Sequence, residues 1–185
     1  MFSEYINNRM NSSKIIFLGG IHGVGKGTLS KKLISELNLE YLSASKLLRW
    51  DRVSNDIQNK KVSNISKTQE RLLNALKEKC EQNKQYILDG HFCLFNAKGV
   101  VEKISFDTFA KINPRIIAVI TTNEKIIKQR LEKRDEKIYD IKLLKKMQKI
   151  EKDYAVEIAS ILKIPFFEIK DGNQNDFINL ISNLN

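Results

Sequence analysis

The chain of 185 residues contains only two cysteines, Cys80 and Cys93, and they do not form a C-x-x-C pair. This argues against a zinc site or a disulfide framework, and we interpret both as reduced thiols. No run approaches the roughly 20 apolar residues that a membrane span needs, and the N-terminal residues lack the charged start and apolar run of a signal segment. We therefore expect a soluble, cytoplasmic protein without a membrane partner.

Acidic residues are also scarce relative to basic ones. The 32 Lys and Arg residues outnumber the 22 Asp and Glu residues, which gives a net charge of +10. Such a charge favours anionic partners, with nucleotides first and nucleic acid as an alternative. The excess is mostly lysine spread along expected helices, and aromatic residues are not interleaved with it as a platform for single strands would require. Nucleic-acid binding is therefore the weaker of the two expectations.

Short apolar segments alternate along the chain with helical patterns. This alternation predicts an α/β fold with a parallel sheet covered by helices on both faces, whose ligands collect at the carboxyl ends of the strands. We expect a polar tail over residues 1–13 and one domain over residues 14–185. The expected strands are residues 14–18, 40–42, 86–88, 115–121 and 166–169.

Helical spacing of apolar residues fills the segments between these strands. One helix carries Leu29 to Leu37, and a second opens with Ser66 and Gln69 at the spacing of a capping box. A third opens at Asn123, and the longest runs from about residue 141 to Leu162, before Pro165. Residues 92–102 are expected to form a hairpin-like excursion near the acceptor pocket.

A glycine-rich run follows the first expected strand and precedes the first expected helix. Its G-x4-G-K spacing from Gly20 to Lys26 predicts a phosphate-binding loop, in which backbone N–H groups and the helix start face the phosphates of ATP. Lys26 would supply charge to the β and γ phosphates. Thr28 lies one residue beyond the usual position of the hydroxyl that ligates Mg²⁺. The predicted nucleotide-binding residues are Gly20, His22, Gly23, Val24, Gly25, Lys26, Gly27, Thr28 and Leu29.

Polar residues follow the second and third expected strands, where a parallel sheet would place its ligands. Asp89 is predicted to hold Mg²⁺ through water, with Thr28 as the second metal-site residue; the alternative is that Asp89 caps the strand end. His91 could orient a reacting group or cap a turn. Arg49 could bind an acceptor phosphate through its planar guanidinium. The predicted acceptor-binding residues are Ser43, Arg49, Gly90 and His91.

Two arginines, Arg130 and Arg134, lie four positions apart on the helix that opens at Asn123. They share one helical face and could together stabilise the charge that phosphoryl transfer spreads over the transferred group. Residues 131–140 would form a short lid, with residues 135–140 as its hinged cover. The predicted catalytic residues are Lys26, Asp89, Arg130 and Arg134.

In this order, the motifs resemble the nucleoside monophosphate kinase family, especially adenylate kinases, over roughly residues 14 to 170. The resemblance rests on Gly20-x4-Gly25-Lys26-Gly27-Thr28, Ser43 to Arg49, Asp89-Gly90-His91 and Arg130 to Arg134. It implies a five-stranded parallel sheet in the order 2-3-1-4-5, ATP with Mg²⁺, and AMP as the favoured acceptor. It further implies that Lys26 bridges the phosphates, Thr28 contacts the α-phosphate side, Arg49 holds the acceptor, and Arg130 and Arg134 are lid arginines.

The chain departs from the adenylate kinase pattern after the third expected strand. Adenylate kinases usually have Asp-Gly-Phe-Pro-Arg there, whereas this chain has Asp89-Gly90-His91-Phe92-Cys93 and lacks the arginine that grips AMP. The Asp-x-His pair and short lid resemble the compact adenylate kinase and ATPase family linked to maturation of the small ribosomal subunit. The leading hypothesis is ATP- and Mg²⁺-dependent transfer to a nucleoside monophosphate. The alternatives are an ATPase coupled to RNA, the ribosome or another partner, and a kinase of another small metabolite.

Overall fold

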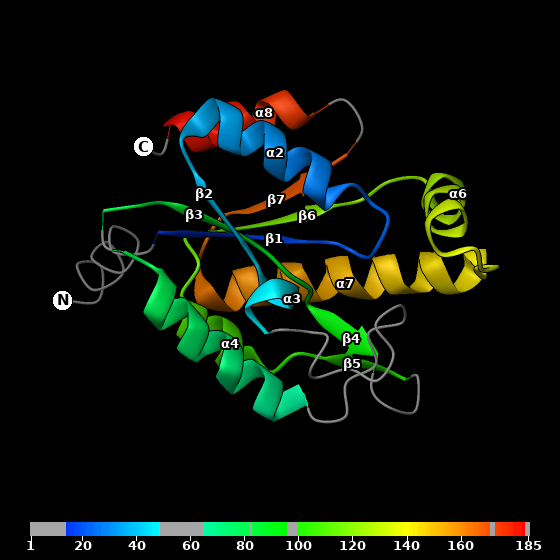
Figure 1. The fold of residues 1–185 in the computed structure, drawn as a ribbon, viewed down its shortest axis with the longest axis horizontal. Helices are drawn as coiled ribbons and strands as arrows, with labels where there is room; N and C mark the ends of the chain where they lie inside the picture. Colours follow the sequence, from blue (N-terminus) through cyan, green and yellow to red (C-terminus); the bar gives the residue numbers. More distant parts are fainter. Residues whose placement is uncertain (1–13, 49–64, 82, 96–99, 171–172, 184–185) are drawn as a thin grey trace.

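The computed structural model describes residues 14–48, 65–81, 83–95, 100–170 and 173–183, and Arg49 lies outside them. A parallel sheet of five strands forms the centre of the molecule, with helices on both faces, as expected (Figure 1). The strand order is β2-β3-β1-β6-β7, which is 2-3-1-4-5 when these strands are numbered among themselves. The strands are β1 (Ile15–Gly19), β2 (Glu40–Ser43), β3 (Tyr86–Asp89), β6 (Ile116–Ile120) and β7 (Phe166–Ile169).

Alternate residues of the central strand β1 supply two separate hydrophobic layers. Ile15 and Phe17 belong to one buried cluster, and Ile16 and Leu18 belong to the other. Because successive side chains of a strand point to opposite faces, a strand covered on both sides must be apolar throughout. This explains the continuous apolar run that the sequence shows at residues 15–18.

The helices divide between the two faces of the sheet (Figure 1). Apolar residues of α2 and α8 join the cluster on one face, and those of α4 and α5 join the cluster on the other. None of the described helices is long and apolar enough to cross a bilayer. The helices are α2 (Lys26–Leu37), α3 (Ala44–Leu47), α4 (Ile65–Lys79), α5 (Phe106–Ile112), α6 (Glu124–Asp135), α7 (Ile141–Leu162) and α8 (Gln174–Asn183).

Helix ends agree with the sequence at two places and differ at a third. The Asn123 side chain accepts a hydrogen bond from Lys125 N at 2.9 Å and caps α6, as its position predicts. Helix α7 ends at Leu162, before Pro165. Helix α4 is described from Ile65 onward, so Ser66 already lies within the helix and is not its N-cap, contrary to the predicted capping box. Serine also occurs within the first helical turn, so the spacing of Ser66 and Gln69 alone could not locate the N-terminus of α4.

The segment after β3 forms a small antiparallel ribbon, in the place where a hairpin-like excursion was expected. Strand β4 (Cys93–Phe95) pairs with β5 (Val101–Lys103). The ring of Phe92 lies 4.9 Å from that of Phe17 and stacks on that of Phe109 at 5.0 Å, measured between centroids. These aromatic contacts fix the turn after β3 against the sheet. The turn therefore has a defined position beside the loop that follows β1.

Candidate active site

The loop between β1 and α2 has the backbone conformation that only glycine adopts without strain. Gly20 has φ of 133°, and an added Cβ would lie 2.8 Å from the carbonyl oxygen of Ile120. Gly25 has φ of 109° and its carbonyl oxygen accepts hydrogen bonds from Thr28 N and Leu29 N at 3.1 Å. The glycines therefore turn the chain tightly from β1 into α2, and the N-terminus of α2 faces the space inside the loop.

Lys26 lies over this loop and is buried, with 8% of its surface exposed. Its Nζ donates to the carbonyl oxygens of Gly20 at 2.6 Å and of Ile21 at 3.4 Å, and lies 3.8 Å from Oδ1 of Asp89. Burial lowers the pKa of Lys26, and the charge of Asp89 partly opposes this shift. The structure thus brings the predicted lysine and aspartate together from separate strand ends.

Asp89 has a second partner that the sequence did not single out. Oδ2 of Asp89 accepts a hydrogen bond from the hydroxyl of Tyr41 at 2.9 Å. Burial and the neighbouring carboxylate raise the pKa of Tyr41 to about 12, so the phenol stays a hydrogen-bond donor. In the pairing of β2 with β3, Tyr41 lies opposite Ile87, and its long side chain reaches Asp89 two residues further along β3. Its place in an expected strand was the only signal that the sequence offered.

Asp89 and Thr28 line the same cavity as the glycine loop. A carboxylate and a hydroxyl are oxygen ligands of the kind that Mg²⁺ accepts, so these residues fit the predicted metal. Among the described residues there is no cluster of three or more His, Cys, Asp or Glu that could hold a metal ion by itself. A bound Mg²⁺ would therefore depend mainly on nucleotide phosphates and water.

The two arginines of α6 have different partners. Arg130 Nη1 donates to the carbonyl oxygens of Gly23 at 3.1 Å and Val24 at 3.2 Å, so this guanidinium already lies against the glycine loop. Arg134 instead binds the carboxylate of Asp135 through Nε at 2.6 Å and Nη2 at 2.7 Å. The helices α6 and α7 are joined by residues 136–140 alone. The predicted lid therefore corresponds to the end of α6 and this short connection.

The hydrogen bond from Arg134 holds the pKa of Asp135 at about 2. The Tyr139 hydroxyl also donates to Oδ2 of Asp135, at 2.5 Å. These contacts join the end of α6 to the connection that follows it. Arg134 consequently has a fixed place next to the loop.

A buried glutamate of α7, Glu151, is a functional candidate that the sequence reasoning missed. Its Oε1 accepts from Gly20 N at 3.2 Å and Phe92 N at 2.9 Å, and its Oε2 accepts from Cys93 N at 2.8 Å. Nδ1 of His91 lies 3.6 Å from Oε1. Burial raises the pKa of Glu151, while the three N–H donors and Lys26 favour its charged form. The signal in the sequence was a charged residue on the mostly apolar face of the longest helix.

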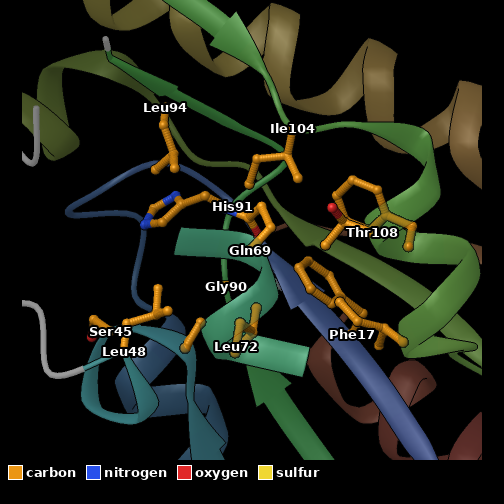
Figure 2. Close-up of a pocket in the computed structure, with 13 residues that line it drawn as sticks. Phe17, Ser45, Leu48, Gln69, Leu72, Gly90, His91, Leu94, Ile104 and Thr108 are labelled. Atoms are coloured by element: carbon orange, nitrogen blue, oxygen red, sulfur yellow. The ribbon is translucent and has the colours of Figure 1, made fainter. Parts of the chain in front are cut away.

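A second, mainly apolar pocket adjoins the phosphate cavity (Figure 2). The two share Ala44, Ser45, Gly90 and His91 in their walls. The side chains of His22 and His91 also approach each other, with ring centroids 4.5 Å apart. The remaining pocket wall includes the apolar residues Phe17, Leu48, Leu72, Leu94 and Ile104, and the polar residues Gln69 and Thr108.

A further cavity lies on the other side of the loop, next to β6 and β7. It is lined by Val24, Thr28, Leu29 and Arg130 together with Lys170 and other residues. Leu29 is also part of the buried core, so the residue has a packing role in addition to its place at this cavity.

Comparison with known proteins then identifies the family. A family model described as "AAA domain" matches residues 19–148, more than half of the chain, from the end of β1 into α7. The chain belongs to this AAA domain family. The matched range contains the glycine loop, Asp89, and both arginines of α6.

This AAA domain is also similar to adenylate kinase isoenzyme 1 of Oryctolagus cuniculus and of Homo sapiens. It is 28% identical to each over 95 residues, which is 46% of this chain and 49% of each relative. The match thus spans about half the length of these curated relatives. The chain is accordingly adenylate kinase-like in sequence, over part of its length.

Solved structures share its fold over nearly the whole chain. A gluconokinase from Sinorhizobium meliloti 1021 matches with a TM-score of 0.57 at 10% identity, covering 94% of this chain and 91% of the other. A sugar kinase from Janibacter sp. HTCC2649 matches with a TM-score of 0.56 at 12% identity, covering 93% and 94%. The chain therefore shares the fold of these two proteins, a parallel sheet covered by helices on both faces.

The structure brings most of the predicted site residues of this AAA domain to one edge of the sheet. The loop residues, Asp89, Gly90 and His91 line the phosphate cavity or border it. Ser43 is not among the residues lining the phosphate cavity or the apolar pocket; its Oγ is hydrogen-bonded to Ser45 Oγ at 2.9 Å. Ser43 therefore contacts Ser45, which lines both cavities, and its role in acceptor binding stays a prediction.

Proposed function

We propose that this AAA domain transfers the γ-phosphoryl group of ATP to a nucleoside monophosphate, with AMP as the favoured acceptor. The observation that carries the proposal is the shared wall between the phosphate cavity and the apolar pocket, at Ala44, Ser45, Gly90 and His91. A triphosphate bound by the glycine loop would place its terminal phosphate next to that pocket. The lining of this pocket, apolar with a few polar groups, suits the base of a second nucleotide. Its volume is about 40 Å³, so the pocket would have to widen to admit the base.

The described side chains would act by position and charge. Lys26 would leave the carbonyl of Gly20 for the β and γ phosphates, and Arg130, already against the loop, would cover the transferred group. Arg134 would add its charge after exchanging Asp135 for phosphate. Mg²⁺, held by the phosphates near Thr28 and Asp89, would neutralise charge between the transferring oxygens. Such catalysis needs no covalent intermediate on the protein.

One observation favours the alternative of a partner-coupled or RNA-coupled ATPase. Cys93 occupies the position where adenylate kinases usually have the arginine that grips AMP. Its side chain is buried in the apolar cluster, and burial raises the pKa of its thiol to about 12. Cys93 therefore offers no positive charge to an acceptor phosphate. Arg49 would have to hold that phosphate in the kinase proposal.

A kinase of another small metabolite is the third possibility. The similar structures named gluconokinase and sugar kinase support the fold, and this fold accommodates many acceptors. Gluconate and glucose therefore belong among the acceptors to be tested. Their hydroxyl groups would have to reach the same wall at Gly90 and His91.

The proposal is tested by incubating the pure protein with ATP and Mg²⁺ and one acceptor at a time. The acceptors are AMP, CMP, UMP, GMP, dTMP, gluconate, glucose and none, with the products separated by chromatography. We expect diphosphate formation from one monophosphate, lost in Lys26→Ala and kept in Lys77→Ala, which removes an exposed lysine of α4. Phosphate release that needs no acceptor would instead support the ATPase, and RNA stimulation would then be measured. A phosphorylated sugar would support the metabolite kinase.

A further inference from the structure

Glu151 is almost fully buried, with 1% of its surface exposed, and yet it carries a carboxylate. Burying a carboxylate is costly unless hydrogen bonds compensate for the lost water. Both oxygens of Glu151 accept backbone N–H groups, from Gly20, Phe92 and Cys93. An apolar residue would suit packing in the core at lower cost. The position of this charge indicates a role beyond packing.

The groups that Glu151 binds belong to two separate parts of the site. Gly20 begins the phosphate loop, and its carbonyl oxygen accepts the hydrogen bond from Lys26 at 2.6 Å. Phe92 and Cys93 directly follow Asp89-Gly90-His91, the turn that borders the apolar pocket. One carboxylate therefore fixes the position of the Lys26 loop relative to the acceptor-side turn.

The same face of α7 also holds the start of α6. Gln148, three residues before Glu151 and thus on the same face, accepts from Thr122 N at 3.0 Å and donates to Thr122 O at 2.9 Å. Thr122 follows β6 and leads into α6, which carries Arg130. Glu151 and Gln148 of α7 therefore form hydrogen bonds with the backbone of the segments that follow β1, β3 and β6.

We infer that Glu151 is a positioning residue for phosphoryl transfer: it aligns the phosphate loop with the acceptor-side turn. The inference rests on the proposed function for the reaction that it names. The contacts themselves predict an effect on ATP binding, whatever the acceptor is. A displacement of about 1 Å between the two parts of the site would reduce the rate of transfer by about 100-fold.

The test compares Glu151→Gln with Glu157→Gln, which alters an exposed glutamate of the same helix. Glutamine has the size of glutamate, but its NH₂ group would face one of the backbone N–H groups. In ¹H–¹⁵N spectra without ligand, we expect the amide signals of Gly20, Phe92 and Cys93 to shift together in Glu151→Gln alone. ATP affinity, measured by calorimetric titration, should fall by about 10-fold. With the acceptor identified above, kcat should fall by about 100-fold.

Glu151→Asp serves as the second variant, since it keeps the buried charge but shortens the side chain by one methylene. It should fold if loss of charge unfolds Glu151→Gln, and it should still lose kcat and ATP affinity. Wild-type kcat and ATP affinity in a folded Glu151→Gln or Glu151→Asp protein, even with a lowered melting temperature, would overturn the inference. If the wild-type protein transfers phosphate to no acceptor, the proposed function fails separately, and ATP affinity still decides the role of Glu151.

Discussion

Two glycine-to-alanine changes, one in the phosphate loop and one in the first turn of α2, should have opposite effects on stability. At Gly20 the backbone has φ of 133°, and the new Cβ would lie 2.8 Å from the carbonyl oxygen of Ile120, which is part of β6 and cannot easily move. Backbone strain of this kind costs about 1–3 kcal/mol, and crowding in a packed interior costs about 1–3 kcal/mol. Gly20→Ala should therefore lose about 2–6 kcal/mol of unfolding free energy.

At Gly27 the same substitution should raise the unfolding free energy. This glycine lies in the first turn of α2, its φ is not in the left-handed region, and an added Cβ would meet nothing within 4 Å. Alanine is favoured over glycine in helices by about 0.5–1 kcal/mol, so Gly27→Ala should stabilise the ligand-free protein by up to that amount. Gly27 also lines the phosphate cavity, so the methyl group should weaken ATP binding. Higher stability and lower affinity would thus occur in one variant.

The assay is thermal unfolding followed by circular dichroism, with and without ATP and Mg²⁺. For a domain of this size, 1 kcal/mol shifts the melting temperature by about 2–4 °C. Without ligand we expect Gly20→Ala to melt about 4–24 °C below the wild type, and Gly27→Ala to melt about 1–4 °C above it. Equal melting temperatures for wild type and Gly20→Ala would refute the conformation assigned to the loop. Unchanged stabilisation by ATP in Gly27→Ala would refute the position assigned to the phosphates.

Three further changes test other parts of the structure. Arg130→Ala should lower kcat by about 100-fold and leave the melting temperature nearly unchanged, because the side chain is exposed; a large fall in melting temperature would contradict this. Asp135→Asn should lower stability at neutral pH by about 1–2 kcal/mol, since the carboxylate that binds Arg134 has its pKa lowered from 3.8 to about 2. The stability that the Asp135 carboxylate contributes is fully present above its ordinary pKa of 3.8 and is lost as the pH falls through about 2. The unfolding free energies of the wild type and Asp135→Asn should therefore become equal near pH 2. A difference that stays constant with pH would exclude the Arg134–Asp135 pair as the source of this stability. Tyr154→Phe removes a buried hydrogen bond of 2.6 Å to the carbonyl oxygen of Ile104 and should cost about 1–2 kcal/mol in urea unfolding, with ATP affinity unchanged.

The strands of the main sheet were predictable as short segments between helical patterns, most clearly where they are apolar throughout, as in β1 and β6. Residues 15–18 and 116–120 are buried on both faces, which leaves an unmistakable apolar signal in the sequence. The β4 and β5 strands gave a weaker signal, because each has three residues and only one neighbour. The start of α4 was missed for a related reason: a serine near a helix start is compatible with several positions along the first turn.

The candidate site was predictable in part. The glycine loop with Lys26 has a fixed local spacing, and Asp89 follows an apolar strand, so both were visible in the sequence. Tyr41 and Glu151 were not, because their partners belong to other segments: Glu151 binds Gly20 across 131 positions of the chain. The acceptor-binding roles of Arg49 and Ser43 remain predictions: Arg49 lies outside the described residues, and Ser43 is hydrogen-bonded to Ser45, which lines the pocket.

The sequence by itself determined the alternation of the five main strands with the helices α2, α4, α6 and α7, the phosphate loop, and the pair of arginines on one helical face. These features depend on spacings of a few residues, which backbone geometry converts directly into local structure. Only the tertiary structure decided that the phosphate cavity and the apolar pocket share a wall, that Arg130 lies on the loop while Arg134 is held by Asp135, and that Glu151 joins the two halves of the site. Those contacts arise when strands and helices distant in sequence pack together, and no local spacing encodes the distances between them.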